Sequence, residues 1–274
     1  MKTIKLSLLA IACLASAGAY AQKAGDTIVN VGWAFINPNA SISPTNTTGS
    51  AATPISGGAA SYINSLRVNT GGYTAAAGNT SADVFNGKLA GASANIDSTS
   101  TLSLSILQML TDNIGAELSF GVPPKLNINL DTPNGTKTQE PNAATARAIT
   151  PAVVAKYFFM SPSSTYRPYL GLGATHASFS RVTPNASNST VVALAGISAS
   201  LSSSWAPVYN AGVIYNFDEK WSLNASVSYI PLKTTATLTG PGLSGISTAF
   251  GNVTTTTKLT MNPTDYIIRL GYKF

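Results

Sequence analysis

Hydrophobic and polar side chains alternate along most of the chain after residue 25, and the alternation is simplest in its last residues. Successive side chains of a β-strand point to opposite faces, so a period of two predicts a strand with one apolar and one mostly polar face. A barrel that closes in an outer membrane needs a final strand of this kind, with aromatic residues at the interface. The apolar face carries Tyr266, Ile268, Leu270, Tyr272 and Phe274, and the other face carries Asp265, Ile267, Arg269, Gly271 and Lys273.

Eight segments of this character occur, and the connections between them alternate between short and long. Short turns on one side and longer loops on the other are typical of an outer-membrane barrel, and an even strand number places both termini on the periplasmic side. The sequence therefore predicts an all-β fold, an eight-stranded antiparallel transmembrane β-barrel with long extracellular loops. The segments are 26–36, 98–110, 116–122, 148–159, 168–179, 208–217, 221–237 and 258–274; the short connections are 111–114, 161–167 and 218–220, and the long ones are 37–97, 125–147, 180–206 and 239–257.

Composition and aromatic placement favour a membrane barrel over a soluble β-sandwich with alternating strands. Only 9% of the 274 residues are charged, whereas a soluble chain normally carries about a quarter. A sandwich does not account for bulky apolar faces on nearly every strand with so few charges. Aromatic residues near the short turns predict one interfacial girdle on the periplasmic side. These residues are Tyr157, Phe158, Phe159, Tyr166, Tyr169, Phe217, Trp221, Tyr272 and Phe274.

The first 21 residues have the features of a cleavable secretory signal peptide. Lys2 and Lys5 precede an apolar run that ends in Ala19-Tyr20-Ala21, a small-x-small cleavage site, so we expect the mature barrel to span 22–274. Cys13 is the only cysteine; cleavage before it would give a lipoprotein, but Ala10-Ile11-Ala12 is a poor approach and the preceding apolar run is short. The mature chain then contains no cysteine, which excludes disulfides and thiol chemistry.

The basic residues are scattered and do not form a nucleic-acid footprint. Removing Lys2 and Lys5 lowers the formal net charge from +6 to +4, and no run of adjacent Lys or Arg is present, so we expect no nucleic-acid partner. Weak attraction to anionic headgroups remains, which makes outer-membrane lipid and lipopolysaccharide the expected surroundings. The stretch 37–97 is rich in Ala, Ser, Thr, Gly and Asn and predicts a long, low-complexity first extracellular loop that contains short helical turns or strand extensions.

Five short stretches of the sequence match one family pattern in order, and they are 110–118, 166–173, 204–205, 221–224 and 271–274. Together they resemble the OmpW family of small outer-membrane barrels. The resemblance implies an eight-stranded barrel with a narrow, largely hydrophobic interior, in a family whose members are proposed to take up small hydrophobic molecules. It places Arg167, Pro168, Gly171, Gly173 and Trp205 at family-motif positions, and Tyr272 and Phe274 in a C-terminal signal read by the barrel-assembly machinery. The chain departs from the family in its longer 37–97 loop and in Thr264, which follows Asn262-Pro263 where an aromatic residue is common.

Because side chains alternate between the two faces of a strand, the apolar outward positions fix the inward ones, an assignment called parity below. Parity assigns Glu117, Lys156 and Arg269 to the barrel interior, among inward positions that are otherwise mostly small or polar. We expect the three to form a paired cluster, because unpaired buried charges are costly. One interpretation is a structural plug that rigidifies the barrel; the other is a polar gate that closes the periplasmic end and sends apolar cargo sideways into lipid. The other inward positions are Asn30, Gly32, Ser103, Ser105, Ser119, Gly171, Gly173, Asn224, Ser226 and Ser228.

Three functional hypotheses follow from these features. The first is a narrow channel or binding protein for passive uptake of small hydrophobic molecules. The second is a structural or surface-interaction barrel that works through its 37–97 loop. The third, a lipid-modifying enzyme, depends on His176, the only histidine, with Ser178 beside it; parity places His176 on the lipid side with no acidic residue close in sequence, so we expect no enzyme activity. We also expect no metal and no cofactor.

Overall fold

The computed structural model describes residues 22–42, 46–49, 57–65, 74–79, 83, 93–134, 136–180, 182–185, 198–240 and 253–274. The predicted signal peptide, with Cys13, lies outside these residues. Nearly all regular structure in the described residues is β-strand, and none of the helices there is long and apolar enough to cross a membrane.

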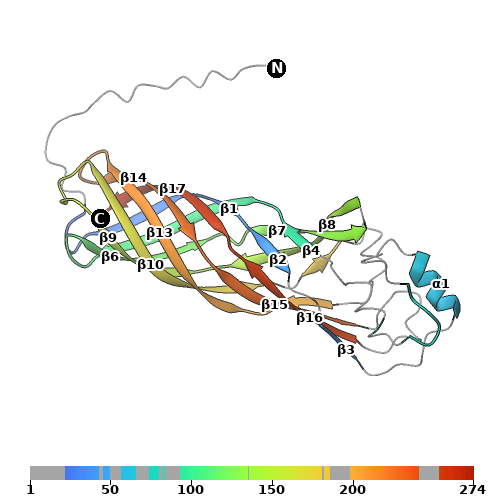
Figure 1. Ribbon diagram of the computed structural model, residues 1–274. Coiled ribbons are helices and arrows are strands. Elements are labelled where there is room, and N and C mark those ends of the chain that lie inside the picture. The colour runs from blue at the N-terminus through green and yellow to red at the C-terminus, as the bar shows by residue number, and fades with distance from the viewer. Residues whose placement is uncertain are drawn as a thin grey trace, which may run out of the picture.

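Eight antiparallel strands close into a barrel, which confirms the predicted fold. Each wall strand pairs with the next in the order β13, β14, β17, β1, β5, β6, β9 and β10, and β10 pairs back with β13. The short turns and the C-terminus lie together at one end of the barrel, the left end of Figure 1. The wall strands are β1 (Thr27–Asn37), β5 (Thr99–Met109), β6 (Ile114–Gly121), β9 (Ala152–Phe158), β10 (Tyr166–Phe179), β13 (Ser204–Asn216), β14 (Trp221–Tyr229) and β17 (Thr264–Lys273).

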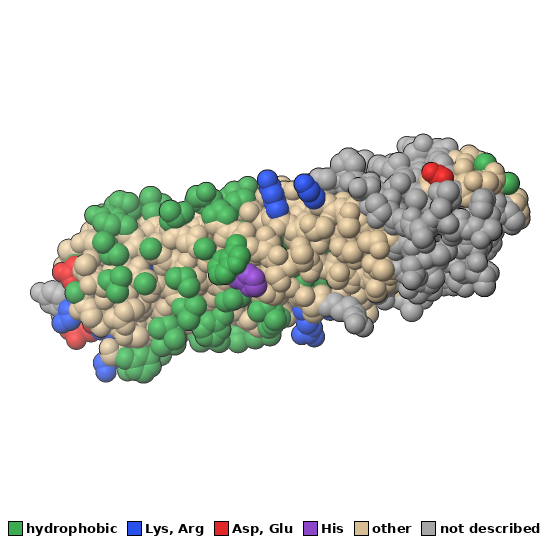
Figure 2. Space-filling view, turned by 90° about the horizontal axis from the view of Figure 1, so that it is seen from below, with side chains coloured by type: hydrophobic (Ala, Val, Ile, Leu, Met, Phe, Trp, Pro, Cys, Tyr) green, Lys and Arg blue, Asp and Glu red, His purple; other side chains and the backbone are tan. Residues whose placement is uncertain are grey.

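The outer surface of these strands is a continuous apolar band. Alternate residues that point outward are large, apolar and exposed, whereas their neighbours point inward and are buried. Figure 2 shows these hydrophobic side chains on the left half of the visible face. A band of this kind is what a bilayer covers in a barrel. Its outward residues include Val31, Trp33, Phe35, Leu118, Val153, Leu170, Leu172, Val227, Ile268 and Leu270.

The wall continues past the apolar band into a polar extension, at the right of Figure 1. One part continues the barrel sheet and the other is a second sheet in which β15 pairs with both β12 and β16, and β16 also pairs with β2 and β3. The elements are β2 (Ala40–Ile42), β3 (Asn46–Gly49), α1 (Gly57–Ser65), β4 (Ser93–Ile96), β7 (Lys125–Asn134), β8 (Thr136–Ile149), β11 (Thr183–Pro184), β12 (Ser198–Leu201), β15 (Leu232–Gly240) and β16 (Val253–Met261).

The extension changes the picture of the long connections. The stretches 125–147, 180–206 and 239–257, expected as loops, contain the β7–β8 hairpin, β11, β12, the beginning of β13 and most of β16's N-terminal half. In the 37–97 stretch, the described residues include β2, β3, α1 and β4. These strands pair with neighbours that also project beyond the membrane band, so their backbones are satisfied without a long apolar face.

Two of the expected long strands are interrupted where a proline falls. The segment 221–237 divides into β14 and β15 at Pro231, and 258–274 divides into β16 and β17 at Pro263. Proline has no backbone N–H to donate to the β-ladder. At both prolines the polypeptide therefore passes between the barrel wall and the second sheet. A hydrogen bond of 3.1 Å from the Ile230 N–H to the Pro263 carbonyl joins the two breaks.

The aromatic residues also differ from expectation in part. Phe158 and Tyr169, predicted in the periplasmic girdle, are fully buried inside the barrel. Outward aromatics near the turns do form contacts there, such as Trp221 with Tyr272 at 4.9 Å between ring centroids. A second group lies near the opposite edge of the band, which completes the two-girdle pattern of membrane barrels. It includes Trp33, Phe35, Trp205, Tyr209, Tyr229 and Tyr266.

Candidate functional site

The barrel interior is filled unevenly from the turn end to the extension. From the turns upward it contains an apolar plug, a layer of paired charges, a polar cavity and an apolar cavity under the extension. This order follows from the sizes of the inward side chains, because eight strands enclose a lumen only about one side chain wide.

The plug fills the barrel just above the short turns. Its six side chains are at most 1% exposed and come from β1, β5, β9, β10 and β13: Ile28, Leu107, Met109, Phe158, Tyr169 and Ile214. Arg167 closes it from below, where its Nη1 donates to the Gln22 carbonyl at 2.6 Å and its guanidinium lies 5.0 Å from the centre of the Phe158 ring. The Gln22 amide in turn donates to Asn216 at 2.6 Å. Large solutes therefore have no path through this end.

The layer above the plug brings together the three charged residues that parity assigned to the interior. Lys156 Nζ lies 2.7 Å from one oxygen of Glu117, and Arg269 Nη1 lies 3.1 Å from the other. Only 2% to 4% of each side chain is exposed. One carboxylate thus holds two cations, and the trio carries one net positive charge.

Polar partners extend this trio across the lumen. Arg269 also donates to Ser103 at 2.7 and 3.0 Å and to Ser105 at 3.3 Å. Lys156 lies 4.3 Å from the centre of the Tyr169 ring, and the Tyr169 hydroxyl donates to Asn224 at 2.9 Å. With Asn30, which donates to Ser105, the network joins seven of the eight wall strands. It therefore links most of the barrel wall at this level.

A polar cavity of about 80 Å³ lies above the charge layer. Its lining includes several small residues, whereas every side chain of the plug is large, so space remains at this level. Two buried oxygens face it without a hydrogen-bond partner in the described residues, Asn210 Oδ1 and Asp265 Oδ1. Other lining residues are Ser119, Gly121, Ala152, Ser226, Ser228 and Arg269.

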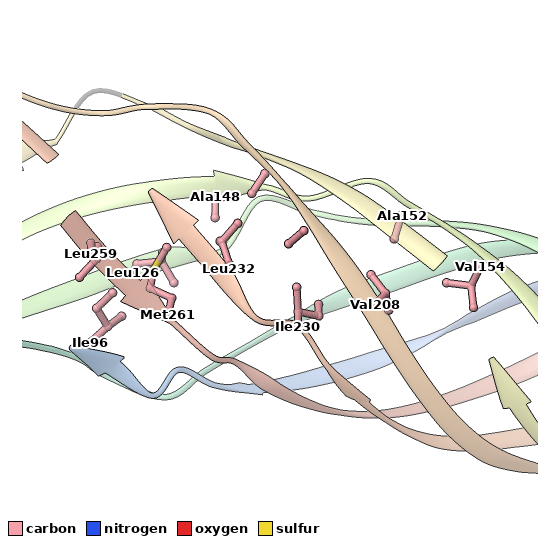
Figure 3. Packing of buried hydrophobic residues seen from close by; sticks show 12 residues of the cluster. Ile96, Leu126, Ala148, Ala152, Val154, Val208, Ile230, Leu232, Leu259 and Met261 are labelled. Carbon is pink, nitrogen blue, oxygen red and sulfur yellow. The ribbon is translucent and has the colours of Figure 1, made fainter. Parts of the chain in front are cut away.

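An apolar cavity of about 60 Å³ lies between the first cavity and the extension. Figure 3 shows the hydrophobic cluster to which several of its lining residues belong, among them Leu126, Leu232 and Met261. Ile36, Thr150, Ile230 and Asp265 line both cavities, so the two are adjacent and this set separates them. The apolar lining includes Ile96, Leu126, Ala148, Leu232 and Met261.

The barrel wall is not fully hydrogen-bonded beside these cavities. The β6–β9 ladder ends at the pair Ser119 and Ala152, and pairing resumes at Lys125 and Arg147. No registered pair joins residues 120–124 to 148–151 in this described part of the wall. Pro123, Pro124 and Pro151 fall in the interval, and proline cannot donate to a ladder. Phe120 and Ala152 line the polar cavity and Pro124 lines the apolar one, so both cavities reach this break.

The family-motif residues have separate positions. Arg167 belongs to the plug, and Pro168 faces outward on the same strand. Gly171 and Gly173 face inward, where a Cβ on Gly173 would collide with the Val153 carbonyl. Trp205 is 72% exposed on the band and contacts His176 in a tilted arrangement, with 4.9 Å between the ring centroids.

His176 and the C-terminal aromatics lie on the outside of the barrel. Figure 2 shows His176 at the edge of the apolar band. Its Nδ1 lies 3.3 Å from the Ser178 hydroxyl, and no group of three or more His, Cys, Asp or Glu side chains gathers anywhere in the described chain. Tyr272 packs between Trp221 and Phe274 at the turn end of the band, and the ring centroids of Tyr272 and Phe274 are 5.1 Å apart.

Several residues of the interior escaped the sequence reasoning. Arg167 was identified only as a motif residue, although it shares parity with inward Tyr169 and Gly171. Asp265 and Asn210 were not singled out, although Asp265 lies four residues before Arg269 on the inward face of the same strand. The signal that could have identified Asp265 and Asn210 is a polar side chain at an inward position of a wall strand.

Comparison with known proteins identifies similar chains. The model of the OmpW family matches residues 64–274. Outer membrane protein W of Vibrio cholerae is 27% identical over 275 residues, covering 100% of both chains, and outer membrane protein AlkL of Ectopseudomonas oleovorans is 25% identical over 193 residues, covering 70% of this chain and 73% of that one. The crystal structure of the outer membrane protein OprG from Pseudomonas aeruginosa has the same fold, with a TM-score of 0.66 at 22% identity, covering 93% of this chain and 98% of that one.

Proposed function

The chain belongs to the OmpW family of outer-membrane β-barrels, and from this premise we propose that it is a narrow channel or binding protein for the passive uptake of small hydrophobic molecules. The observation that carries the proposal is the apolar cavity under the extension, directly above a barrel that is sealed further down. Cargo that enters from the outside meets an apolar surface first and has no straight path to the periplasm.

The charge layer makes passage along the axis unfavourable. Moving an apolar molecule through it requires separating Glu117 from two buried cations, and breaking one buried pair costs about 3–5 kcal/mol. The plug would then have to be displaced as well, which is costly because its side chains are almost fully buried. We therefore propose that the trio closes the periplasmic end and that cargo leaves by another route.

The break between β6 and β9 supports a sideways route into the membrane. A wall held by a complete ladder would have to lose backbone hydrogen bonds to open, but here prolines already leave the interval unpaired. Phe120 and Val153 border this region on the lipid face. An apolar molecule passing between the strands would move directly from the cavity into hydrocarbon, without crossing water.

Filling the apolar cavity tests the proposal. Ala148→Trp places a large side chain among Leu126, Leu232 and Ile230, so we expect most of the protein-dependent uptake to be lost. Uptake is measured with radiolabelled naphthalene in cells that express the chain, minus uptake in cells without it. Leu172→Trp, on the lipid face, is the matched control and should take up naphthalene normally. Normal uptake by a correctly folded Ala148→Trp barrel would refute the role of this cavity.

The size of the polar extension supports a second candidate, a surface-interaction barrel that works through its 37–97 segment. In Figure 2 a mostly polar surface of described residues follows the apolar band. Deleting residues 50–92 distinguishes the two functions. If adhesion or recognition falls while naphthalene uptake survives, the second candidate is favoured; the reverse result favours uptake.

Cations just outside the apolar band support lipopolysaccharide as the surrounding lipid. Lys125 and Arg147 are direct cross-strand neighbours and both are exposed. Like charges at such a pair repel each other, so an anion between them is stabilising. Lys233 and Lys258 lie on adjacent strands at a similar level, both exposed. Phosphates of the lipid headgroups fit this arrangement.

A further inference from the structure

Two buried acceptor oxygens of the interior have no hydrogen-bond donor among the residues that the structure describes. Asn210 Oδ1 and Asp265 Oδ1 are both buried, and both residues line the polar cavity. The Asn210 amide nitrogen donates to the Val227 carbonyl at 3.1 Å and to the Ser228 hydroxyl at 2.9 Å. A carbonyl can only accept, so the nitrogen must lie on that side and the oxygen must face the cavity.

The two oxygens belong to one row across three strands. Asn210 is directly opposite Ser228, and Ser228 is directly opposite Asp265, so all three side chains point inward at the same level. Two strand spacings separate the outer residues by roughly 10 Å between Cα atoms. A single small ligand group placed between the Asn210 and Asp265 side chains can span that distance.

The cations of the interior do not serve these oxygens. The guanidinium of Arg269 is directed to Glu117, Ser103 and Ser105, and the ammonium of Lys156 to Glu117 and Tyr169. Asp265 forms no ion pair in the described chain. A buried carboxyl without a donor is costly, and a ligand that supplies one removes the penalty.

We propose that Asp265 and Asn210 bind the ammonium end of a small alkyl amine whose hydrocarbon chain lies in the adjacent apolar cavity. An ammonium carries three donors and no acceptor, so one ammonium can donate to both the Asn210 and the Asp265 oxygens. Asp265 lines both cavities, so it stands where the polar end of such a molecule meets the apolar end. A charge-assisted bond to the carboxylate is stronger than one from a neutral alcohol. This inference rests on the proposed uptake function and narrows its cargo.

The test is a nuclear magnetic resonance titration of the barrel in phosphatidylcholine nanodiscs. The ligands are hexylamine, hexanol and hexane, and the reporters are the Asn210 side-chain amide, the Asp265 backbone amide and the methyl groups of Leu232 and Met261. We expect hexylamine to shift all four, and Asp265→Asn to weaken its binding about 10- to 100-fold, as the loss of a charged hydrogen bond implies. Glu219→Gln, which makes the same change on an exposed turn, should bind hexylamine like the unaltered chain.

The outcomes separate this inference from the proposed function. If all three ligands shift Leu232 and Met261 with equal affinity and Asp265→Asn changes nothing, the amine site is refuted but the apolar cavity stands. If no ligand shifts those methyl groups, both are refuted. If Asp265→Asn fails to fold, Asn210→Leu removes the other acceptor; unchanged hexylamine affinity in that variant also refutes the site.

Discussion

Glu117→Gln isolates the contribution of the buried charge layer. The substitution keeps the shape of the side chain but leaves two cations, Lys156 and Arg269, without their counter-charge. Breaking one buried pair by removing a partner costs about 3–5 kcal/mol. Two pairs are lost here, at 2.7 and 3.1 Å, but Arg269 retains two serines and Lys156 retains the Tyr169 hydroxyl. We therefore expect a net loss near the same 3–5 kcal/mol, not twice as much.

Urea unfolding in phospholipid vesicles measures this loss. With a slope of about 2 kcal/mol per molar urea, the midpoint should fall by about 2 M. Adding Lys156→Met to Glu117→Gln removes one uncompensated charge and should restore at least half of the lost stability, because an apolar replacement of a buried ion is often tolerated. Glu219→Gln on the exposed turn should stay within about 0.5 kcal/mol of the unaltered chain.

A change below about 0.5 kcal/mol in Glu117→Gln would refute the reasoning, since it would mean that the cations are satisfied without the carboxylate. Conductance of the same variant in planar bilayers separates the plug from the gate. A gate that depends on Glu117 alone predicts new ion conductance. A structural plug predicts none, because the apolar side chains below remain in place.

Two further changes test other parts of the barrel. Phe158→Ala removes the centre of the plug and should destabilise the barrel by about 3–5 kcal/mol in the same urea assay; a loss below 1 kcal/mol would show that the plug collapses around the gap. Replacing Lys125 and Arg147 with Gln should reduce co-purifying lipopolysaccharide, measured by phosphate content, whereas Lys220→Gln at the turn end should not; equal lipid in both would contradict the anion-bridged pair.

Strand parity gave most of the barrel because the lipid and the lumen impose opposite demands on neighbouring residues. The alternation in 266–274 predicted correctly which side chains face the membrane and placed Arg269 inside. The same parity put Glu117 and Lys156 on facing sides of adjacent strands, where the structure joins them. The expected cluster of all three charges is also present, because Arg269 reaches Glu117 from a strand that does not pair with β6. No local pattern encodes the distance between those two strands.

The extension was harder to predict because its strands lack a greasy face. β15 and β16 are rich in Thr, including the run Thr254–Thr257, and β-branched residues favour strands even where both faces are polar. An apolar alternation therefore does not mark them as separate strands. Prolines at 231 and 263 were the available signal that the membrane strands end there. The prediction that Phe158 belongs to the girdle is wrong for a different reason. Phe158 lies near a turn, but the alternation along its strand directs it inward.

The direction of the proposed route follows from how side-chain volume is distributed inside a wall of constant width. Eight strands give the same lumen at every level, so only the inward residues decide where it is open. Near the turns they are Leu107, Met109 and Phe158, and the lumen is full; higher up they are Ser119, Ala152 and Ser226, and a cavity remains. The β6–β9 break lies beside the open part and not beside the plug. A molecule in the cavity therefore faces a sealed floor and an incomplete wall at the same level, and the wall is the easier way out.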